Sequence, residues 1–446
     1  MALASMLQRS RCLLAVFLTV LPICTRPSLA QGAPADLPRV TLPDAPSLIY
    51  SRRPDDPWNQ IFYFLFSRRL AVRLSPDFPE GAPFLDPGER ISVSRQVFEK
   101  DEIGDRAIEP LYPTFFVGFG GMLVLRDPAY SRFTKSLKAA LDDDSPRSAV
   151  ARALMQNDLW GAYDEFFFPL LPDDEKLLGV RRMSALDLIG HFIRKIALTP
   201  AEIGALPENY SAVARRQSLP DVFGKDSGWT EIEWFMPRAH DDAAGFRKVS
   251  RVFLKPDHPP RNMKKFLNSL ADDPQNVTSL AGVALVIQLL LVDSHGDLRP
   301  TRLVVDAQTR LFERTPEGKI KASVKEAEIS RKLYSEDPNS GGLVLEDERT
   351  PAYLSNGGSY EFAEGQIMPG QKPEIREPVQ VRLRTRCALC HGEDLQQLMT
   401  FSIARPPHHK GPPIRQLDRE ATEAADVDIG AKRKQETFKA LLEYFR

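Results

Sequence analysis

Cysteine is scarce in this chain. Only four of its 446 residues are cysteines, which excludes the dense disulfide framework of small secreted domains and leaves a hydrophobic core as the source of stability. The chain also has no excess of positive or negative charge, with 59 Lys and Arg against 60 Asp and Glu. The formal net charge of −1 argues against a general nucleic-acid-binding protein, so we expect no nucleic-acid partner.

The composition that remains is that of a globular protein. The chain is 42% hydrophobic and 27% charged, and its length allows two or three domains with a sizeable core. Internal repeats are not visible, and proline is frequent, with 37 residues. We therefore expect many loops and interrupted elements.

Residues 1–30 have the pattern of a secretory signal peptide. Arg9 and Arg11 precede the apolar run 12–23, which is too short to span a bilayer comfortably, and residues 28–30, Ser-Leu-Ala, are a small-residue cleavage site. Later runs are neither long nor apolar enough to span a bilayer. The sequence therefore predicts an exported, periplasmic protein with no transmembrane segment in the mature chain.

Cleavage at this site leaves a mature chain that begins near Gln31. An alternative to soluble export is lipidation at Cys24, although Ile23 occupies the position where a lipobox has a small residue. Cleavage after residue 30 also removes Cys12 and Cys24. The expected mature chain then has two cysteines, Cys387 and Cys390.

Both remaining thiols lie in the stretch RTRCALCHGED, residues 384–394, and His391 follows the second thiol directly. The pattern Cys-x-x-Cys-His has a chemical reason. Two thiols at this spacing can reach the two vinyl groups of one porphyrin and form thioethers, and the next residue can then point its imidazole at the iron. A single tight helical turn can place both thiols and the imidazole in this way.

At Cys387, Cys390 and His391 the chain resembles the c-type cytochromes, whose haem attachment motif is Cys-x-x-Cys-His. The resemblance implies one covalently bound haem c (iron) and His391 as the proximal iron ligand. It covers about five residues closely and residues 371–446 loosely. A second copy of the motif is not present, which argues against a multihaem protein or a two-haem peroxidase.

Two other interpretations of the same residues remain open. A Cys387–Cys390 disulfide or thioredoxin-like dithiol is one, but we see no βαβ pattern around it. A zinc site is the other, but a second pair of ligands at metal spacing is missing. The nearby His408 and His409 are adjacent in sequence rather than spaced.

The distal haem ligand has three candidates in the sequence: Met368, His408 and His409. An open or water-bound iron is also compatible with the sequence. Met399 is close to the motif, and we expect it to be a core residue.

A strand with period-two alternation is expected at residues 381–386, directly before the motif. Its arginines Arg382, Arg384 and Arg386 could pair with the haem propionates, because guanidinium groups suit carboxylates. The alternative is the solvated face of an amphipathic strand. His191 and His295 are expected to be solvated rather than ligands.

The fold class indicated is α+β: a helical N-terminal block, then antiparallel strands, then a C-terminal haem c segment. We divide the chain into the signal peptide 1–30, an α+β region 31–370 of unrecognised family, and a cytochrome c-like haem-binding segment 371–446.

Hydrophobic periodicity places the individual elements. Helices are expected at residues 58–70, 145–167, 183–198 and 261–270, and in a terminal stripe of Phe438, Leu441, Leu442 and Phe445. Strands are expected within 114–125 and at 250–256, 283–293 and 301–313, the last two joined by a hairpin loop. Residues 335–373 are expected to form irregular loop.

Three functions are compatible with this pattern. The first is single-electron transfer between the haem and an unknown redox partner protein. The second is a peroxidase-like haem enzyme, or a redox or ligand sensor, with an open distal site. The third is a structural or binding protein in which the haem is vestigial or absent. We favour the first, because it needs no catalytic group besides the haem.

Overall fold

The structure, a computed structural model, describes residues 46, 48–66, 68–74, 102–108, 124–167, 176–233, 247–272, 278–316, 320–346, 351–354, 379–382, 415–416, 429–430 and 432–446. Within residues 68–74, 102–108, 351–354, 379–382 and 415–416 it describes the backbone alone. The described residues all belong to one unit, residues 38–446. Their helices and antiparallel strands confirm the α+β class predicted from the sequence.

Helix α2, Pro57–Phe66, is apolar on every side and buried almost throughout. A helix of that kind belongs inside a protein rather than on its surface. The helix ends earlier than the predicted residue 70. Residues 68–70 belong instead to strand β1, Arg68–Leu74, because all seven residues of β1 pair with β2, Glu102–Ile108.

The two helices predicted to follow are present as α5 and α6, in a block with three further helices that the sequence analysis did not predict. The block consists of α4 (Ala129–Asp142), α5 (Ala149–Phe167), α6 (Lys176–Ile196), α7 (Pro200–Gly204) and α8 (Tyr210–Gln217). Helix α5 packs against α6, and α4 contacts both α2 and α6. These contacts bury an aromatic core in which the Trp58 ring lies 5.8 Å from that of Phe192. In the described part of the chain, no helix combines the length and apolarity that crossing a bilayer requires.

Helix α5 begins at Ala149, later than the start predicted at Ser145-Pro146. Ion pairs explain the difference. The Arg147 guanidinium contacts Asp56 at 2.9 Å and Asp143 at 3.1 Å. The backbone N–H of Ser145 donates to the Asp143 side chain. These contacts hold the segment between α4 and α5 outside either helix.

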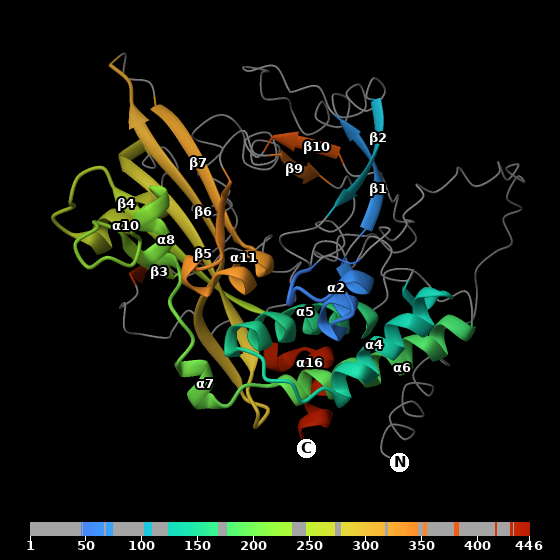
Figure 1. Ribbon diagram of the computed structural model, residues 1–446. Helices are drawn as coiled ribbons and strands as arrows, with labels where there is room; N and C mark the ends of the chain where they lie inside the picture. Colours follow the sequence, from blue (N-terminus) through green and yellow to red (C-terminus); the bar gives the residue numbers. More distant parts are fainter. Residues whose placement is uncertain are drawn as a thin grey trace, which may run out of the picture. The chain divides into compact units, whose positions relative to one another are not determined.

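The larger sheet has seven strands in the order β11-β3-β4-β5-β6-β7-β8, and every neighbouring pair is antiparallel. Its strands are β3 (Thr230–Glu233), β4 (Lys248–Pro256), β5 (Leu280–Val292), β6 (Leu298–Arg314), β7 (Ile320–Ile329), β8 (Leu343–Glu346) and β11 (Arg415–Gln416). The strands predicted at 250–256, 283–293 and 301–313 and their hairpin are confirmed. Figure 1 shows the long strands side by side, with α5, α6 and α16 gathered at one end.

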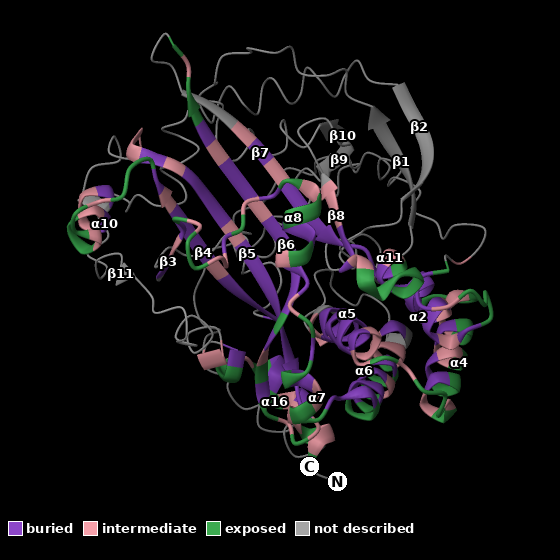
Figure 2. Ribbon diagram, turned by 60° about the vertical axis from the view of Figure 1, so that its left-hand side comes forward, coloured by how far each residue is buried: buried purple, intermediate pink, exposed green. Residues whose placement is uncertain are grey.

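The two faces of this sheet are covered differently. On one face Phe253 packs against Phe223, which packs against Tyr210 of α8. On the opposite face α10, Met263–Asp272, places Leu267 and Leu270 against Val252. Burial extends along β4, β5 and β6 between these two layers (Figure 2). The helix predicted at residues 261–270 is therefore confirmed as α10.

A second sheet has four strands in the order β2-β1-β10-β9. Strand β10, Val379–Arg382, pairs in parallel with β1 and in antiparallel with β9, Pro351–Leu354. The residues of β9, together with β8, lie inside the stretch 335–373 that was expected to be irregular loop. That expectation is wrong at both strands, because each is only four residues long and is fixed by backbone pairing with β7 or β10.

Residues that follow the motif join elements far earlier in the chain. Strand β11 pairs with β3, and the helix α16, Glu436–Leu442, contacts α5. The predicted apolar stripe is confirmed, with Phe438 and Leu441 buried. Short elements complete the list: α11 (Arg331–Glu336), η4 (Pro338–Ser340) and η5 (Glu443–Phe445).

Candidate functional site

The candidate site is the Cys-x-x-Cys-His motif, and the structure describes the strands that precede and follow it in the sequence. The motif residues Cys387, Cys390 and His391 lie outside the described residues, as do Met368, Met399, Arg384, Arg386, His408 and His409. Arg382 lies in β10, where the backbone alone is described. We call residues 383–414 the motif segment, because β10 ends just before it and β11 begins just after it.

The residues just before and just after the motif segment are held by backbone pairing. On the N-terminal side, Arg382 is paired with Pro351 of β9, and Val379 with Arg73 of β1. On the C-terminal side, Arg415 is paired with Glu233 of β3. The strands that precede and follow the motif segment therefore belong to different sheets, and β11 is at the edge of the seven-stranded one.

The donor set of the motif fits a covalently bound haem. Two thiols can form thioethers, and an imidazole is a strong axial ligand for iron. Within the part of the chain that the structure describes, no group of three His, Cys, Asp or Glu side chains is placed to hold a metal ion.

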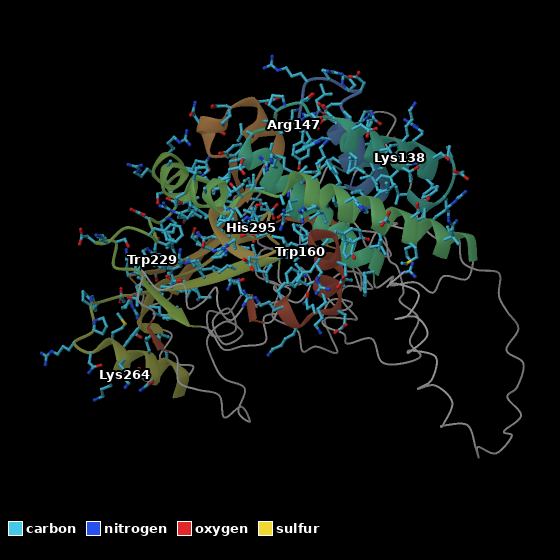
Figure 3. All side chains as sticks on the ribbon, turned by 90° about the horizontal axis from the view of Figure 1, so that it is seen from below. Lys138, Arg147, Trp160, Trp229, Lys264 and His295 are labelled. Carbon is cyan, nitrogen blue, oxygen red and sulfur yellow. The ribbon has the colours of Figure 1, made fainter. Side chains whose placement is uncertain are left out.

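The two histidines expected to be solvated are placed as predicted. His191 on α6 is exposed, its Nδ1 lies 2.9 Å from the Asp187 carbonyl oxygen, and its ring lies 5.0 Å from that of Tyr444. His295 lies exposed at the hairpin tip between β5 and β6 (Figure 3). Its backbone N–H donates to the side chain of Asp293.

Ionic groups that the sequence analysis did not single out are buried along α5. Asp158 is fully buried and accepts hydrogen bonds from Arg331 of α11 and from the Tyr50 hydroxyl, the latter at 3.0 Å. Burial raises the pKa of Asp158, and the Arg331 guanidinium opposes that rise. Burial, together with the nearby carboxylate, also raises the pKa of Tyr50. The cluster joins α5, α11 and the segment before α2.

A second ionic cluster lies further along the same helix, at Asp164. Asp164 accepts from Arg247 at 2.7 Å and from Lys432 at 3.0 Å. The Lys432 ammonium also lies 4.6 Å from the centre of the Trp160 ring. Figure 3 shows Trp160 on α5 beside α16, where Phe438 packs on its ring. Burial lowers the pKa of Lys432 to about 8, although Asp164 opposes the shift.

The geometry of these two clusters indicates a role in packing rather than in catalysis. Each carboxylate is bound by a guanidinium, and the Lys432 side chain is fully buried and also donates to the Gln435 side chain. Buried charges arranged in this way fix how elements pack. The Asp164 cluster therefore attaches the residues that follow the motif segment to α5.

Comparisons with models of protein families, with curated proteins and with solved structures found no match to this chain.

Any functional assignment therefore rests on the chain's own residues. A sequence signal for the α5 clusters does exist. Gln156-Asn157-Asp158 is a run of polar residues between the apolar pairs Leu154-Met155 and Leu159-Trp160. Polar residues inside an otherwise apolar helix are typical of buried hydrogen-bonding groups. Arg331, the partner of Asp158 far along the chain, has no comparable signal.

Proposed function

We propose that this chain is an exported haem c protein that transfers single electrons through one covalently attached haem. The observation that carries the proposal is the sequence Cys387-Ala-Leu-Cys390-His391 in a chain whose expected mature part has no other cysteine. An exported protein that keeps two thiols beside one histidine has the residues that haem attachment requires.

The chain's own residues have distinct parts in this function. Cys387 and Cys390 hold the group covalently, and His391 provides its proximal ligand. Haem supplies a one-electron couple whose potential depends on axial ligation, burial and nearby charge. The pairing of β10 and β11 supports a fixed place for such a centre, because the residues just before and just after the motif segment are held in sheets.

The proposal includes a location and a partner. The Ser28-Leu29-Ala30 site supports export to the periplasm, with residues 371–446 as the C-terminal haem c segment. A protein that transfers single electrons needs a redox partner protein, whose identity the sequence does not specify.

Haem attachment is tested by expressing the full chain together with the haem-maturation machinery. A denaturing gel stained for haem peroxidase activity should show one band at the mass of the mature chain. The Cys387→Ala, Cys390→Ala double variant should lose the stain. A colourless but fully folded wild-type protein contradicts the proposal.

A further inference from the structure

Helix α4 and the residues just before it present a row of positive charge to solvent. Residues 126–141 contain four cationic side chains and one acidic side chain, Asp127, which pairs with Arg181 of α6. All four cationic side chains are exposed. We call them the cationic row, and its members are Arg126, Arg132, Lys135 and Lys138.

Helical spacing places three of these cations on one side of α4. Arg132, Lys135 and Lys138 follow each other at intervals of three residues, so they lie within an arc of about 120° on the helix surface. The opposite side of the helix is buried and is formed by Phe133, Leu137 and Ala140 (Figure 2). The three cations are therefore on the outer side of the helix.

The stability of the fold does not account for these cations. Within the described part of the chain, the side chains of Arg126, Lys135 and Lys138 form no ion pair. Arg132 lies over the Phe64 ring, 5.3 Å from its centre. The first turn of α4 has no acidic residue, its last turn has no basic one, and the helix ends at Asp142. The opposite arrangement of charge stabilises a helix, because its N-terminal end is partially positive.

The carboxylates near the end of α4 leave the cationic row positive. Asp143 pairs with Arg147 at 3.1 Å, and Asp144 pairs with Lys195 at 2.9 Å. Asp142 is exposed, but it lies one turn beyond Lys138, at the end of the row. The positive charge is therefore concentrated between Arg126 and Lys138.

The neighbouring helix adds exposed apolar side chains beside the row. Val180 is 69% exposed and Met183 is 45% exposed, which is unusual for large apolar side chains in this protein. Arg181 lies next to Val180 in sequence, stacks over the Tyr130 ring of α4 at 4.9 Å and pairs with Asp127. Figure 1 shows α4 and α6 side by side, and the two helices are in contact. The two apolar side chains therefore lie close to the N-terminal end of α4.

Cations beside exposed aliphatic side chains suit a surface of anionic lipid. Lys and Arg are attracted to the negative headgroups, and apolar side chains enter the boundary between headgroups and acyl chains. A protein partner fits less well, because protein interfaces are centred on aromatic or Arg anchors that fill pockets. Among the described side chains of α4 and α6, no Phe, Tyr or Trp is exposed.

From the placement of these cations and of the apolar side chains beside them, we infer that the outer side of α4 and the first half of α6 form a docking surface for an anionic lipid bilayer. The protein binds there peripherally. Lys135 and Lys138 face the headgroup phosphates, and Val180 and Met183 enter the interface. This inference goes beyond electron transfer and does not depend on the haem.

Co-sedimentation with lipid vesicles tests the docking. The mature chain should bind vesicles made of equal parts phosphatidylglycerol and phosphatidylcholine, and it should not bind phosphatidylcholine alone. The variant Lys135→Gln, Lys138→Gln should weaken binding by about 20-fold, because each cation near an anionic surface strengthens binding roughly fivefold. The matched control Lys264→Gln, Lys265→Gln removes two exposed lysines of α10 and should bind like the wild type.

A second variant tests the apolar part of the surface. Val180→Ser with Met183→Ser should weaken binding to the anionic vesicles by about tenfold, because less apolar surface enters the bilayer. Poly-glutamate has negative charge but no bilayer, so it should bind far more weakly than the vesicles, and this variant should not change its binding. All substituted side chains are exposed, and circular dichroism checks that each variant is folded.

The inference is overturned if the wild type binds neither kind of vesicle or binds both equally. Equal loss of binding in the Lys135, Lys138 variant and in its control also overturns it. Poly-glutamate binding as tight as vesicle binding would overturn it as well, and would assign the surface to an acidic protein partner. Haem content of the same samples tests the proposed function separately, since a haem-free chain that binds anionic vesicles would contradict that proposal alone.

Discussion

Asp158 of α5 and Arg331 of α11 form a two-point ion pair in the protein interior. The Nη2–Oδ1 distance is 2.5 Å and the Nε–Oδ2 distance is 2.6 Å, and the side chains are 0% and 3% exposed. The pair connects the helical block to the element that follows β7. Removal of either side chain therefore leaves the other charge buried without this partner.

Asp158→Asn should destabilise the protein by about 3–5 kcal/mol, because it leaves the Arg331 guanidinium buried beside a neutral amide. Urea unfolding followed by circular dichroism measures the change. Tyr50→Phe, which removes one hydrogen bond to the same carboxylate, should cost about 2 kcal/mol. The prediction is wrong if the two variants are equally stable.

Lys432 should make stability depend on pH. Burial lowers its pKa to about 8 from an ordinary 10.5, so between these values the unfolded chain binds the proton more fully than the folded protein. Stability contributed by this group therefore rises as pH increases through that window, by up to about 3 kcal/mol.

The pH effect is measured against Lys432→Met, which is neutral at every pH. The free energy of unfolding of the wild type should gain on that of the variant between about pH 8 and pH 10.5. A difference between the two proteins that is independent of pH would show that the Lys432 ammonium keeps its ordinary affinity for the proton.

Gly190→Ala on α6 should lower stability, because a Cβ at this position overlaps the ring of Tyr444. Gly204→Ala is the matched control, since nothing lies within 4 Å of its added carbon, and it should raise stability by about 0.5–1 kcal/mol. In a Tyr444→Ala background, Gly190→Ala should become stabilising too. Thermal unfolding of Gly190→Ala, Gly204→Ala, Tyr444→Ala and the Gly190→Ala, Tyr444→Ala double variant measures these changes in stability.

His391→Ala should give a protein with an altered Soret band or no attached haem. His391 follows the second thiol directly, and its imidazole has little freedom to point elsewhere once both thioethers have formed. An absorption spectrum of the variant, prepared like the wild type, is the measurement. A wild-type spectrum would exclude His391 as the proximal ligand.

Carbon monoxide distinguishes electron transfer from chemistry at an open iron. If a Met or His side chain occupies the distal position, the reduced protein should show a low-spin spectrum and bind no carbon monoxide. Fast, stoichiometric binding would contradict electron transfer as the main function and favour the peroxidase-like or sensor alternative.

The elements that the sequence predicted well are those with strong local patterns. The apolar stripe of Leu186, Ile189, Ile193 and Ile196 indicated α6, and the β5–β6 hairpin follows from two apolar runs joined by a Gly-containing turn. The predicted bounds of these elements were less accurate. Helix α6 begins at Lys176 rather than near residue 183, and its added turns include Arg181 and Arg182, which contact Asp127 and the Phe166 carbonyl oxygen.

Elements held by distant partners were not predictable. Strand β7 carries Glu326 and Glu328 at buried positions, which a single sequence shows only as polar residues. Strands β8, β9 and β11 are two to four residues long, and their partners define them. For the site, the sequence predicted the motif and its haem, and these stay predictions because the motif lies outside the described residues. Thr114–Leu125 lies almost entirely outside them as well.

The pairing of β11 with β3 and of α16 with α5 has a consequence for the order of events during folding. Both contacts join residues separated by a large part of the chain, and contacts of that kind form late. The core around Trp160 stays incomplete until Phe438 packs against the Trp160 ring. The proposed attachment of haem to Cys387 and Cys390 requires accessible thiols, and a chain that has not yet formed these contacts offers them. On the proposed function, we predict that variants that speed the docking of α16 reduce the yield of haem-bearing protein even as they stabilise the fold.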